Sequence, residues 1–289
     1  MSADSSKTVV VTGASTGIGW GCVKVLTEDG WRVFAAVRRT EDAERLTAAF
    51  GDAVRPLILD VTDSKGVAAA ASEVDAALGG KTLAGLVNNA GIAVAGPLLH
   101  LKIEAFERQL AVNLTGPLIV TQAFAPLLGA DRSRSGPPGR IVMMSSVGGL
   151  SASPFVGAYS ASKFGLEGLS ESLRRELMLY GIDVVIINPG VVATPIWGKS
   201  GRVNADFAGT PYAAAVAKVK ATMLAMGKAG LPPERIGEAV RTALSAQRPK
   251  VRYIVTPTPL QDFFARNLPK RLVDRLMADR LGLAPSCRR

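Results

Sequence analysis

The sequence is poor in the residues that build metal centres and disulfide frameworks. Its 289 residues include one histidine, His100, and two cysteines, Cys22 and Cys287. A single histidine excludes a histidine-rich metal site. Two isolated cysteines do not make the disulfide framework of a small secreted protein. We therefore expect no bound metal, and we expect Cys22 to pack inside a helix.

Long apolar runs are also missing. No stretch reaches the roughly 18 apolar residues of a membrane-spanning helix. Residues 1–7 are polar and lack the apolar core of a secretion signal. Apolar residues make up 48% of the chain and charged residues 20%, which is typical of globular proteins. These features predict a cytoplasmic protein.

Acidic residues are scarce near the C-terminus. The chain has a net charge of +10, and residues 250–289 hold nine basic and three acidic side chains. Such a segment can attract nucleic acid or anionic lipid. No nucleic-acid-binding motif accompanies the charge, so we expect no nucleic-acid partner. Within this segment, Pro259–Leu283 spaces its apolar residues as a helix would. We expect it to pack on the domain or to pair subunits, and peripheral membrane contact is the alternative.

Apolar runs alternate with helix-length segments along the chain, which is typical of a parallel sheet wound by crossover helices. We therefore predict an α/β fold: a single Rossmann-type domain over residues 1–289, with about seven strands and helices on both faces. Residues 194–231 are predicted to form a substrate loop or lid, and residues 256–289 a C-terminal helical extension. Two long helices are predicted over Ile103–Leu128 and Gly157–Tyr180. The predicted strands are Thr8–Val11, Trp31–Val37, Val54–Leu59, Leu83–Val87, Arg140–Met144, Asp183–Ile187 and Val251–Val255.

A glycine-rich loop follows the first predicted strand. In the segment TGASTGIG, Gly13, Gly17 and Gly19 let the backbone turn sharply and approach a pyrophosphate. The N–H groups and dipole of the next helix attract the same anion. The second strand is followed by Arg38 and Arg39 and not by the acidic residue that binds the ribose hydroxyls of NAD. Guanidinium groups suit a 2′-phosphate, so NADP(H) is predicted to be preferred over NAD(H). The alternative is that the two arginines only face water.

Polar residues converge on the carboxyl ends of the predicted strands. Tyr159 and Lys163 lie four residues apart and so share one face of a helix. A phenol with a pKa near 10 is a poor acid–base catalyst at neutral pH, and a neighbouring ammonium lowers that pKa. Ser146 follows the fifth strand and Asn88 the fourth, at the same edge of the sheet. Asn113 lies inside a long helix, where a carboxamide is a poor choice unless it bonds to something.

Six motifs follow one another along the chain: TGASTGIG, NNAG, VN at Val112–Asn113, SS at Ser145–Ser146, YSASK and PGVVAT. Through them, Lys7–Pro195 resembles the compact form of the short-chain dehydrogenase/reductase family. The stretch Ser145–Leu177 further resembles the branch that holds 17β-hydroxysteroid and retinol dehydrogenases. The resemblance implies an oxidoreductase that moves a hydride to or from a carbonyl or alcohol carbon. It also implies a homodimer or homotetramer in which the two long helices pair.

The resemblance implies four catalytic roles. Tyr159 is the general acid in reduction and the general base in oxidation. Lys163 lowers the pKa of Tyr159 and bonds the nicotinamide ribose. Ser146 polarises the substrate oxygen. Asn113 anchors a water that links Lys163 to solvent as a proton relay.

The same resemblance implies where the cofactor lies. Ser15 assists binding of the 2′-phosphate, and Asp60 and Val61 contact the adenine. The NNAG segment contacts the adjoining ribose, and Val192 and Thr194 hold the nicotinamide carboxamide. The residues expected to bind NADP(H) are Gly13, Ser15, Thr16, Gly17, Ile18, Gly19, Arg38, Arg39, Asp60, Val61, Asn88, Ala90, Gly91, Tyr159, Lys163, Pro189, Gly190, Val192 and Thr194.

An apolar pocket for a lipophilic alcohol, ketone or aldehyde is expected beside the reacting centre. Val147 and Phe155 follow the fifth strand and Trp197 lies in the lid segment, so these residues are expected to contact the substrate. The alternative is that they only pack the loop onto the domain. A non-catalytic NADP(H)-binding sensor is the alternative function, although intact Tyr159 and Lys163 argue against it. An epimerase or dehydratase on this fold would space its glycines differently.

Overall fold

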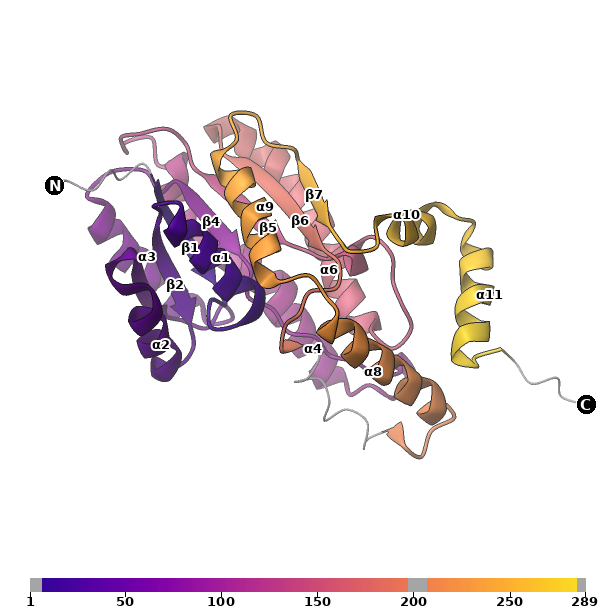
Figure 1. The fold of residues 1–289 in the computed structure, drawn as a ribbon. Coiled ribbons are helices and arrows are strands. Elements are labelled where there is room, and N and C mark those ends of the chain that lie inside the picture. Colours follow the sequence, from indigo (N-terminus) through magenta and orange to yellow (C-terminus); the bar gives the residue numbers. More distant parts are fainter. Residues whose placement is uncertain (1–6, 197–206, 285–289) are drawn as a thin grey trace, which may run out of the picture.

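The computed structural model describes residues 7–196 and 207–284. Its centre is a seven-stranded sheet whose neighbouring strands all pair in parallel, in the order β3-β2-β1-β4-β5-β6-β7 (Figure 1). The winding direction reverses beside β1, and such a reversal opens a crevice at the carboxyl ends of the strands. The predicted α/β fold is thereby confirmed. The strands are β1 Thr8–Thr12, β2 Arg32–Val37, β3 Val54–Ile58, β4 Gly85–Asn88, β5 Arg140–Met144, β6 Asp183–Pro189 and β7 Arg252–Val255.

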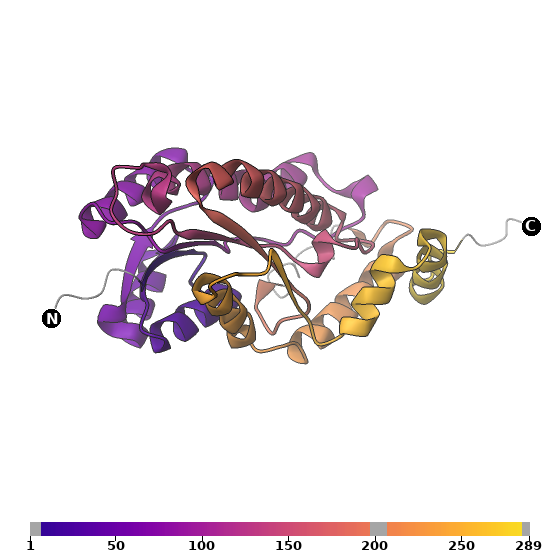
Figure 2. The same cartoon turned by 90° about the horizontal axis from the view of Figure 1, so that it is seen from above.

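Helices cover both faces of the sheet (Figure 2). The α-helices are α1 Gly17–Glu28, α2 Thr40–Phe50, α3 Ser64–Leu78, α4 Ile103–Leu110, α5 Gly116–Phe124, α6 Gly157–Glu176, α8 Ala213–Lys228, α9 Pro233–Ser245, α10 Pro259–Asn267 and α11 Lys270–Leu281. One apolar core joins α1, α2 and α9 to the sheet through Leu26, Leu46 and Val240. The other joins α3 and α5 to the opposite face through Val74 and Phe124. Because both faces are covered, β1 (TVVVT) is buried along its whole length and shows no alternation of polar residues.

Short 3₁₀ helices also occur within the described residues. They lie at Gly51–Ala53, Leu98–His100, Val147–Gly149 and Leu177–Tyr180.

Local sequence signals mark both ends of α3. The Asp63 side chain caps α3 by accepting from the Lys65 N–H at 3.1 Å, and Gly79 ends that helix in the left-handed conformation.

The helix predicted over Ile103–Leu128 is not a regular α-helix. It consists of α4, a π-helical turn over Ala111–Thr115, α5 and a second π-helical turn. Pro117 has no N–H and cannot bond the Asn113 carbonyl four residues before it. The Gly116 N–H bonds instead to the carbonyl five residues before it. The predicted helix therefore continues through Asn113, but with a wider turn there, because Pro117 cannot bond the Asn113 carbonyl.

The predicted lid segment, residues 194–231, contains α8. Trp197, which we expected to contact substrate, and Cys287 lie outside the described residues. Helices α10 and α11 form an arm that extends beyond the end of the sheet (Figure 1). The end of this arm returns to α8, because Leu281 packs against the cluster that includes Tyr212. No helix within the described ranges is long and apolar enough to cross a membrane.

Candidate active site

The loop between β1 and α1 is shaped by glycines. Gly13 has a φ of +66°, and a Cβ on it would lie 2.7 Å from the Ala90 Cα. A Cβ on Gly19 would lie 2.2 Å from the Gly13 carbonyl oxygen. Both positions therefore require glycine. Thr16, the N-cap of α1, makes no side-chain capping bond, so an anion can take that place at the first N–H groups of the helix. This backbone cradle fits the pyrophosphate of a dinucleotide.

Asn89 braces the glycine-rich loop from the end of β4. Its Nδ2 donates to the Thr12 carbonyl at 2.8 Å and to the Gly13 carbonyl at 3.2 Å. The Thr12 hydroxyl accepts from the backbone N–H groups of Asn89 and Ala90, each at 3.0 Å. The sequence reasoning singled out Asn88 and missed Asn89, although both belong to the NNAG motif. Asn89 thus holds the loop in the shape that the glycines permit.

Two residues expected at the cofactor turn their side chains into the core. Asn88 is 3% exposed, and its Nδ2 donates to the Thr121 hydroxyl at 3.0 Å and to the Met143 sulfur at 3.4 Å. Val61 is 7% exposed, and a Cβ on Gly116 would lie 2.8 Å from its Cγ2. Any contact of Asn88 or Val61 with the cofactor is therefore limited to backbone atoms.

Arginines gather where β2 passes into α2. Arg38 and Arg39 are exposed, and the Arg38 guanidinium lies 3.9 Å from the Asp60 carboxylate. Arg45 of α2, which the sequence reasoning did not single out, donates to the Ser15 carbonyl. Three arginines therefore lie on the segment that follows β2, and the Arg45 guanidinium reaches the glycine-rich loop. Such a cluster suits the 2′-phosphate of NADP(H).

Asp60 is held as an anion within this cluster. Burial acts to raise the pKa of its carboxyl group. Hydrogen bonds from the Thr62 N–H at 2.9 Å and the Thr62 hydroxyl at 2.7 Å outweigh that effect, together with the charges of Arg38 and Arg108, and hold the pKa below its usual value. An exposed pair at this distance is weak. Asp60 therefore orients Arg38 without cancelling the positive charge of the cluster.

Ser146, Tyr159 and Lys163 lie together at the end of β5. Lys163 Nζ donates to the Met144 carbonyl at 2.6 Å and lies 5.8 Å from the centre of the Tyr159 ring. The Ser146 hydroxyl accepts from the Gly148 N–H at 3.0 Å and shares a hydrogen bond with the Tyr159 phenol. A Cβ on Gly148 would lie 3.3 Å from Cε1 of Tyr159. Glycine at this position keeps the space beside the phenol open.

The ionisation of the tyrosine and lysine differs from the expectation. Burial raises the pKa of Tyr159, and the hydrogen bond with Ser146 only partly opposes this. Burial lowers the pKa of Lys163 to about 8, and the nearby charge of Glu167 only partly opposes this. We expected the lysine to lower the tyrosine pKa, but here its ammonium is bonded to the Met144 carbonyl. The phenol is therefore protonated at neutral pH, which suits a general acid.

Asn113 uses its carboxamide inside the protein. The side chain is 1% exposed; its Oδ1 accepts from the Ile92 N–H at 2.9 Å, and its Nδ2 donates to the Ile92 carbonyl at 3.0 Å and the Ser162 hydroxyl at 3.2 Å. These bonds tie the loop after β4 to α6. The carboxamide is thus fully engaged within the protein, and the water that the family resemblance implies for Asn113 stays a prediction.

The segment after β6 borders the same crevice. Val192 forms a bridge with Leu231, at the far end of the lid segment. A Cβ on Gly17 would lie 3.0 Å from Cγ2 of Thr194. Thr194 therefore lies against the glycine-rich loop, while contact of Pro189–Thr194 with the dinucleotide stays a prediction.

Of the residues expected to contact substrate, Phe155 packs against the lid segment. Val147 is half-buried in the short helix after β5. Phe155 is buried, packs with Ala215 and Val216 of α8, and meets the Tyr212 ring edge-on at 5.8 Å between centroids. Phe155 also has a φ of +66°, a conformation that few non-glycine residues adopt. It anchors α8 to the body of the protein.

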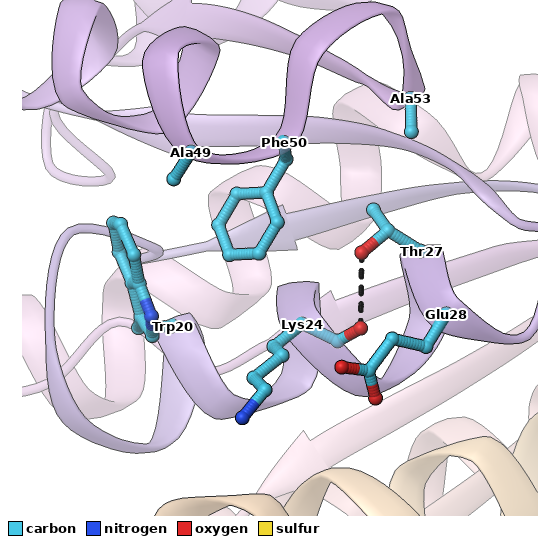
Figure 3. A pocket seen from close by; sticks show the side chains of 7 residues that line it. All are labelled: Trp20, Lys24, Thr27, Glu28, Ala49, Phe50 and Ala53. Carbon is cyan, nitrogen blue, oxygen red and sulfur yellow. Dashed lines mark hydrogen bonds between the residues drawn. The ribbon is translucent and has the colours of Figure 1, made fainter.

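A hollow of 610 Å³ lies elsewhere, between α1 and α2 (Figure 3). The rings of Trp20 and Phe50 stand 5.0 Å apart on its wall. Its other lining residues are Lys24, Thr27, Glu28, Ala49 and Ala53. None of the expected site residues lines it, so it is separate from the crevice that holds Tyr159.

Sequence relatives point to one family. Residues 7–204 match the family profile described as short chain dehydrogenase. The chain is 37% identical over 268 residues to the NADPH-dependent 3-dehydrocapnine reductase of Ornithobacterium rhinotracheale, covering 92% of this chain and 94% of that protein. It is 40% identical over 191 residues to retinol dehydrogenase 16 of Mus musculus, covering 66% of this chain and 58% of that protein.

Solved structures agree with this assignment. A short-chain dehydrogenase from Streptomyces avermitilis matches with a TM-score of 0.77 and 27% identity, over 99% of this chain and 100% of that one. A metagenomic short-chain oxidoreductase in complex with NADP matches with a TM-score of 0.67 and 29% identity, over 89% and 99%. A short-chain dehydrogenase/reductase from Burkholderia phymatum in complex with NAD shares the fold, with a TM-score of 0.78 and 22% identity over 96% and 97%.

Proposed function

Because the chain belongs to the short-chain dehydrogenase/reductase family, and is thus an oxidoreductase acting on CH–OH or carbonyl groups with NAD(P), we propose that it interconverts a lipophilic alcohol and its ketone or aldehyde with NADP(H). One observation carries this proposal. The hydroxyl groups of Ser146 and Tyr159 are hydrogen-bonded to each other, with Lys163 one turn away, beside the space that Gly148 leaves open.

The chain's own groups handle the proton and the substrate oxygen. NADP(H), when bound, supplies or accepts the hydride. Tyr159 delivers its phenolic proton to the carbonyl oxygen in reduction and takes a proton from the alcohol in oxidation. The Ser146 hydroxyl, fixed by the Gly148 N–H, donates a hydrogen bond to the same oxygen. Lys163, one helical turn away on α6, would bond the nicotinamide ribose.

The proposed preference for NADP(H) rests on charge. Arg38 and Arg39 stand where an acidic residue would select NAD(H), and Arg45 adds a third guanidinium beside Ser15. The name of the Ornithobacterium relative describes an NADPH-dependent enzyme, and the metagenomic structure is an NADP complex. The Burkholderia structure is an NAD complex, but its lower identity carries less weight.

A lipophilic substrate is proposed because the lid side of the site is apolar. Phe155, Ala215 and Val216 form a buried apolar cluster next to the loop that carries Ser146 and Val147. Lid segments of this composition admit apolar molecules and exclude water from the reacting atoms.

The proposed function is tested by the absorbance of reduced nicotinamide. The purified enzyme should consume NADPH faster than NADH with members of a panel of lipophilic ketones and aldehydes. The reverse reaction should appear with the matching alcohols and NADP. A protein that binds NADPH tightly, yet turns over no member of a broad panel in either direction, would instead fit the non-catalytic sensor.

We propose that the protein is a cytoplasmic homo-oligomer and that its C-terminal arm makes peripheral contact with a membrane. Helix α10 presents Leu260, Phe263 and Phe264 on one face, 73%, 53% and 52% exposed. Basic side chains of this arm are Arg266, Lys270, Arg271, Arg275 and Arg280. A face with exposed aromatic rings and basic neighbours suits an anionic lipid surface. A second copy is a poorer partner for this face, since each copy carries a net charge of +10.

We expect the protein to sediment with phosphatidylcholine vesicles that contain phosphatidylserine, and less with vesicles that lack it. The double variant Phe263→Ser/Phe264→Ser should weaken this binding by about tenfold or more, because it withdraws two large apolar groups. Met178→Ser, at an exposed apolar residue on another element, serves as control. Sedimentation velocity distinguishes the alternative: an oligomer that dissociates in the double variant would show that α10 pairs subunits.

A further inference from the structure

Glu167 is a buried carboxylate one helical turn beyond Lys163 on α6. Glu167 is 8% exposed to solvent. Oε1 accepts from Asn188 Nδ2 at 2.7 Å, and Oε2 lies 2.6 Å from the Arg252 guanidinium of β7. Burying an ion pair costs desolvation and often adds little net stability. Holding α6 to β7 is therefore an incomplete reason for a charge at this position.

Asn188 links Glu167 to the catalytic serine. It is fully buried on β6, and the Nδ2 that bonds Glu167 also donates to the Ser146 backbone carbonyl at 2.9 Å. The Ser146 backbone is thus held from behind by Asn188, while its hydroxyl is held by the Gly148 N–H at 3.0 Å. Because one amide nitrogen bonds both groups, a shift of the Glu167 carboxylate would move the Asn188 side chain and so disturb the Ser146 backbone.

The charge of Glu167 also acts on Lys163. Burial lowers the pKa of Lys163 to about 8, and the negative charge of Glu167 works against that fall. The other titratable or charged groups around the pair are Tyr159 and Glu171 on α6 and Arg252 on β7. Strands β5 and β6 and the π-helical turn contribute uncharged polar groups, which include Ser146, Asn188 and Asn113.

We propose that Glu167 is a positioning residue for the reaction: through Asn188 it fixes Ser146, and through its charge it keeps Lys163 protonated. The proposal rests on the proposed function, in which Ser146 and Lys163 serve the reacting centre. The positive charge of Arg252 partly cancels the effect of the Glu167 charge on the pKa of Lys163. A purely structural pair would hold α6 against β7 and leave the ionisation of Lys163 unchanged.

The test follows the ionisation of Lys163 itself. The full-length enzyme is labelled with ¹⁵N-lysine, and the Lys163 side-chain signal is assigned with Lys163→Met and titrated with pH. Glu167→Gln keeps an acceptor for Asn188 but removes the charge. It is expected to lower the titration midpoint by about one pH unit, the effect of a unit charge within about 10 Å at an effective dielectric constant of about 20. Arg252→Gln is expected to raise the midpoint.

Glu171→Gln is the matched control, because it neutralises a half-buried carboxylate one turn further along α6. It should move the Lys163 midpoint clearly less than Glu167→Gln does, because the Glu171 carboxylate is farther from Lys163 and is screened by solvent. Where a substrate is known, the alkaline limb of kcat/KM should move with the midpoint in Glu167→Gln, which a merely structural role would not produce.

Two outcomes overturn the proposal: a midpoint that stays fixed in both Glu167→Gln and Arg252→Gln, or one that moves equally in Glu167→Gln and Glu171→Gln. If one of the first two variants fails to fold, the other decides, because their expected shifts have opposite signs. The titration requires no substrate. A shifted midpoint in a protein without carbonyl turnover would therefore support the charge effect and count against the proposed function.

Discussion

Replacing Tyr159 by phenylalanine is expected to lower NADPH-dependent carbonyl reduction by about 1,000-fold and to change NADPH affinity by less than about twofold. The phenol shares a hydrogen bond with Ser146, and its raised pKa keeps it protonated at neutral pH. The substitution removes one oxygen from a ring that otherwise keeps its place on α6. Turnover is measured by NADPH absorbance, and affinity by the quenching of protein fluorescence.

Tyr180→Phe serves as the control for this experiment. Tyr180 ends the short helix after α6 and lies by Arg132, whose guanidinium is 5.9 Å from the ring centre. This variant should keep full activity. If Tyr159→Phe also kept most of its activity, the proton would have to come from another group, and the assignment of Tyr159 as general acid would be wrong.

Replacing Arg38 by alanine is expected to weaken NADPH binding by about 10- to 100-fold, because a charge-assisted bond to a phosphate contributes about 1.5–3 kcal/mol. NADH affinity should change by less than about twofold, since NADH lacks the 2′-phosphate. Arg38 is well placed for this test: its side chain is exposed, and its pairing with Asp60 at 3.9 Å is loose. Dissociation constants for both cofactors, measured side by side, give the ratio directly.

Arg39→Ala and Arg45→Ala complete this series. Arg39 is exposed at the start of α2, and Arg45 is already bonded to the Ser15 carbonyl and to Asp42. If Arg38→Ala weakened NADPH and NADH equally, its guanidinium would lie outside the 2′-phosphate site. If only Arg45→Ala weakened NADPH binding and left NADH binding unchanged, the 2′-phosphate site would lie closer to Ser15.

Most of the fold could be predicted because hydrophobic burial shapes the sequence pattern directly. Strands covered on both faces are buried along their whole length and are rich in apolar residues, and β1 shows this with three consecutive valines between two buried threonines. The π-helical turn at Asn113 was not predicted, because apolar periodicity does not reveal hydrogen-bond register. Pro117 was the available signal, since it cannot bond the carbonyl four residues before it.

The candidate site was predictable where a motif fixes the chemistry, as at Tyr159 and Lys163. Side-chain direction was not predictable: in the pair Asn88–Asn89, one amide enters the core and its neighbour braces the glycine-rich loop. Glu167 was missed for a different reason. Its partners come from β6 and β7, and contacts between such distant segments exist only in the folded chain.

The left-handed backbone of Phe155 limits how the range of substrates can change in evolution. Asparagine or glycine would suit its φ of +66° better, but either would withdraw the ring that packs on Ala215 and Val216. A substitution that relieved the backbone strain at Phe155 would therefore weaken the packing that holds the lid segment to the domain. If the proposed function holds, we expect new specificities to be reached more readily through substitutions on α8, which would reshape the lid segment and leave Phe155 in place.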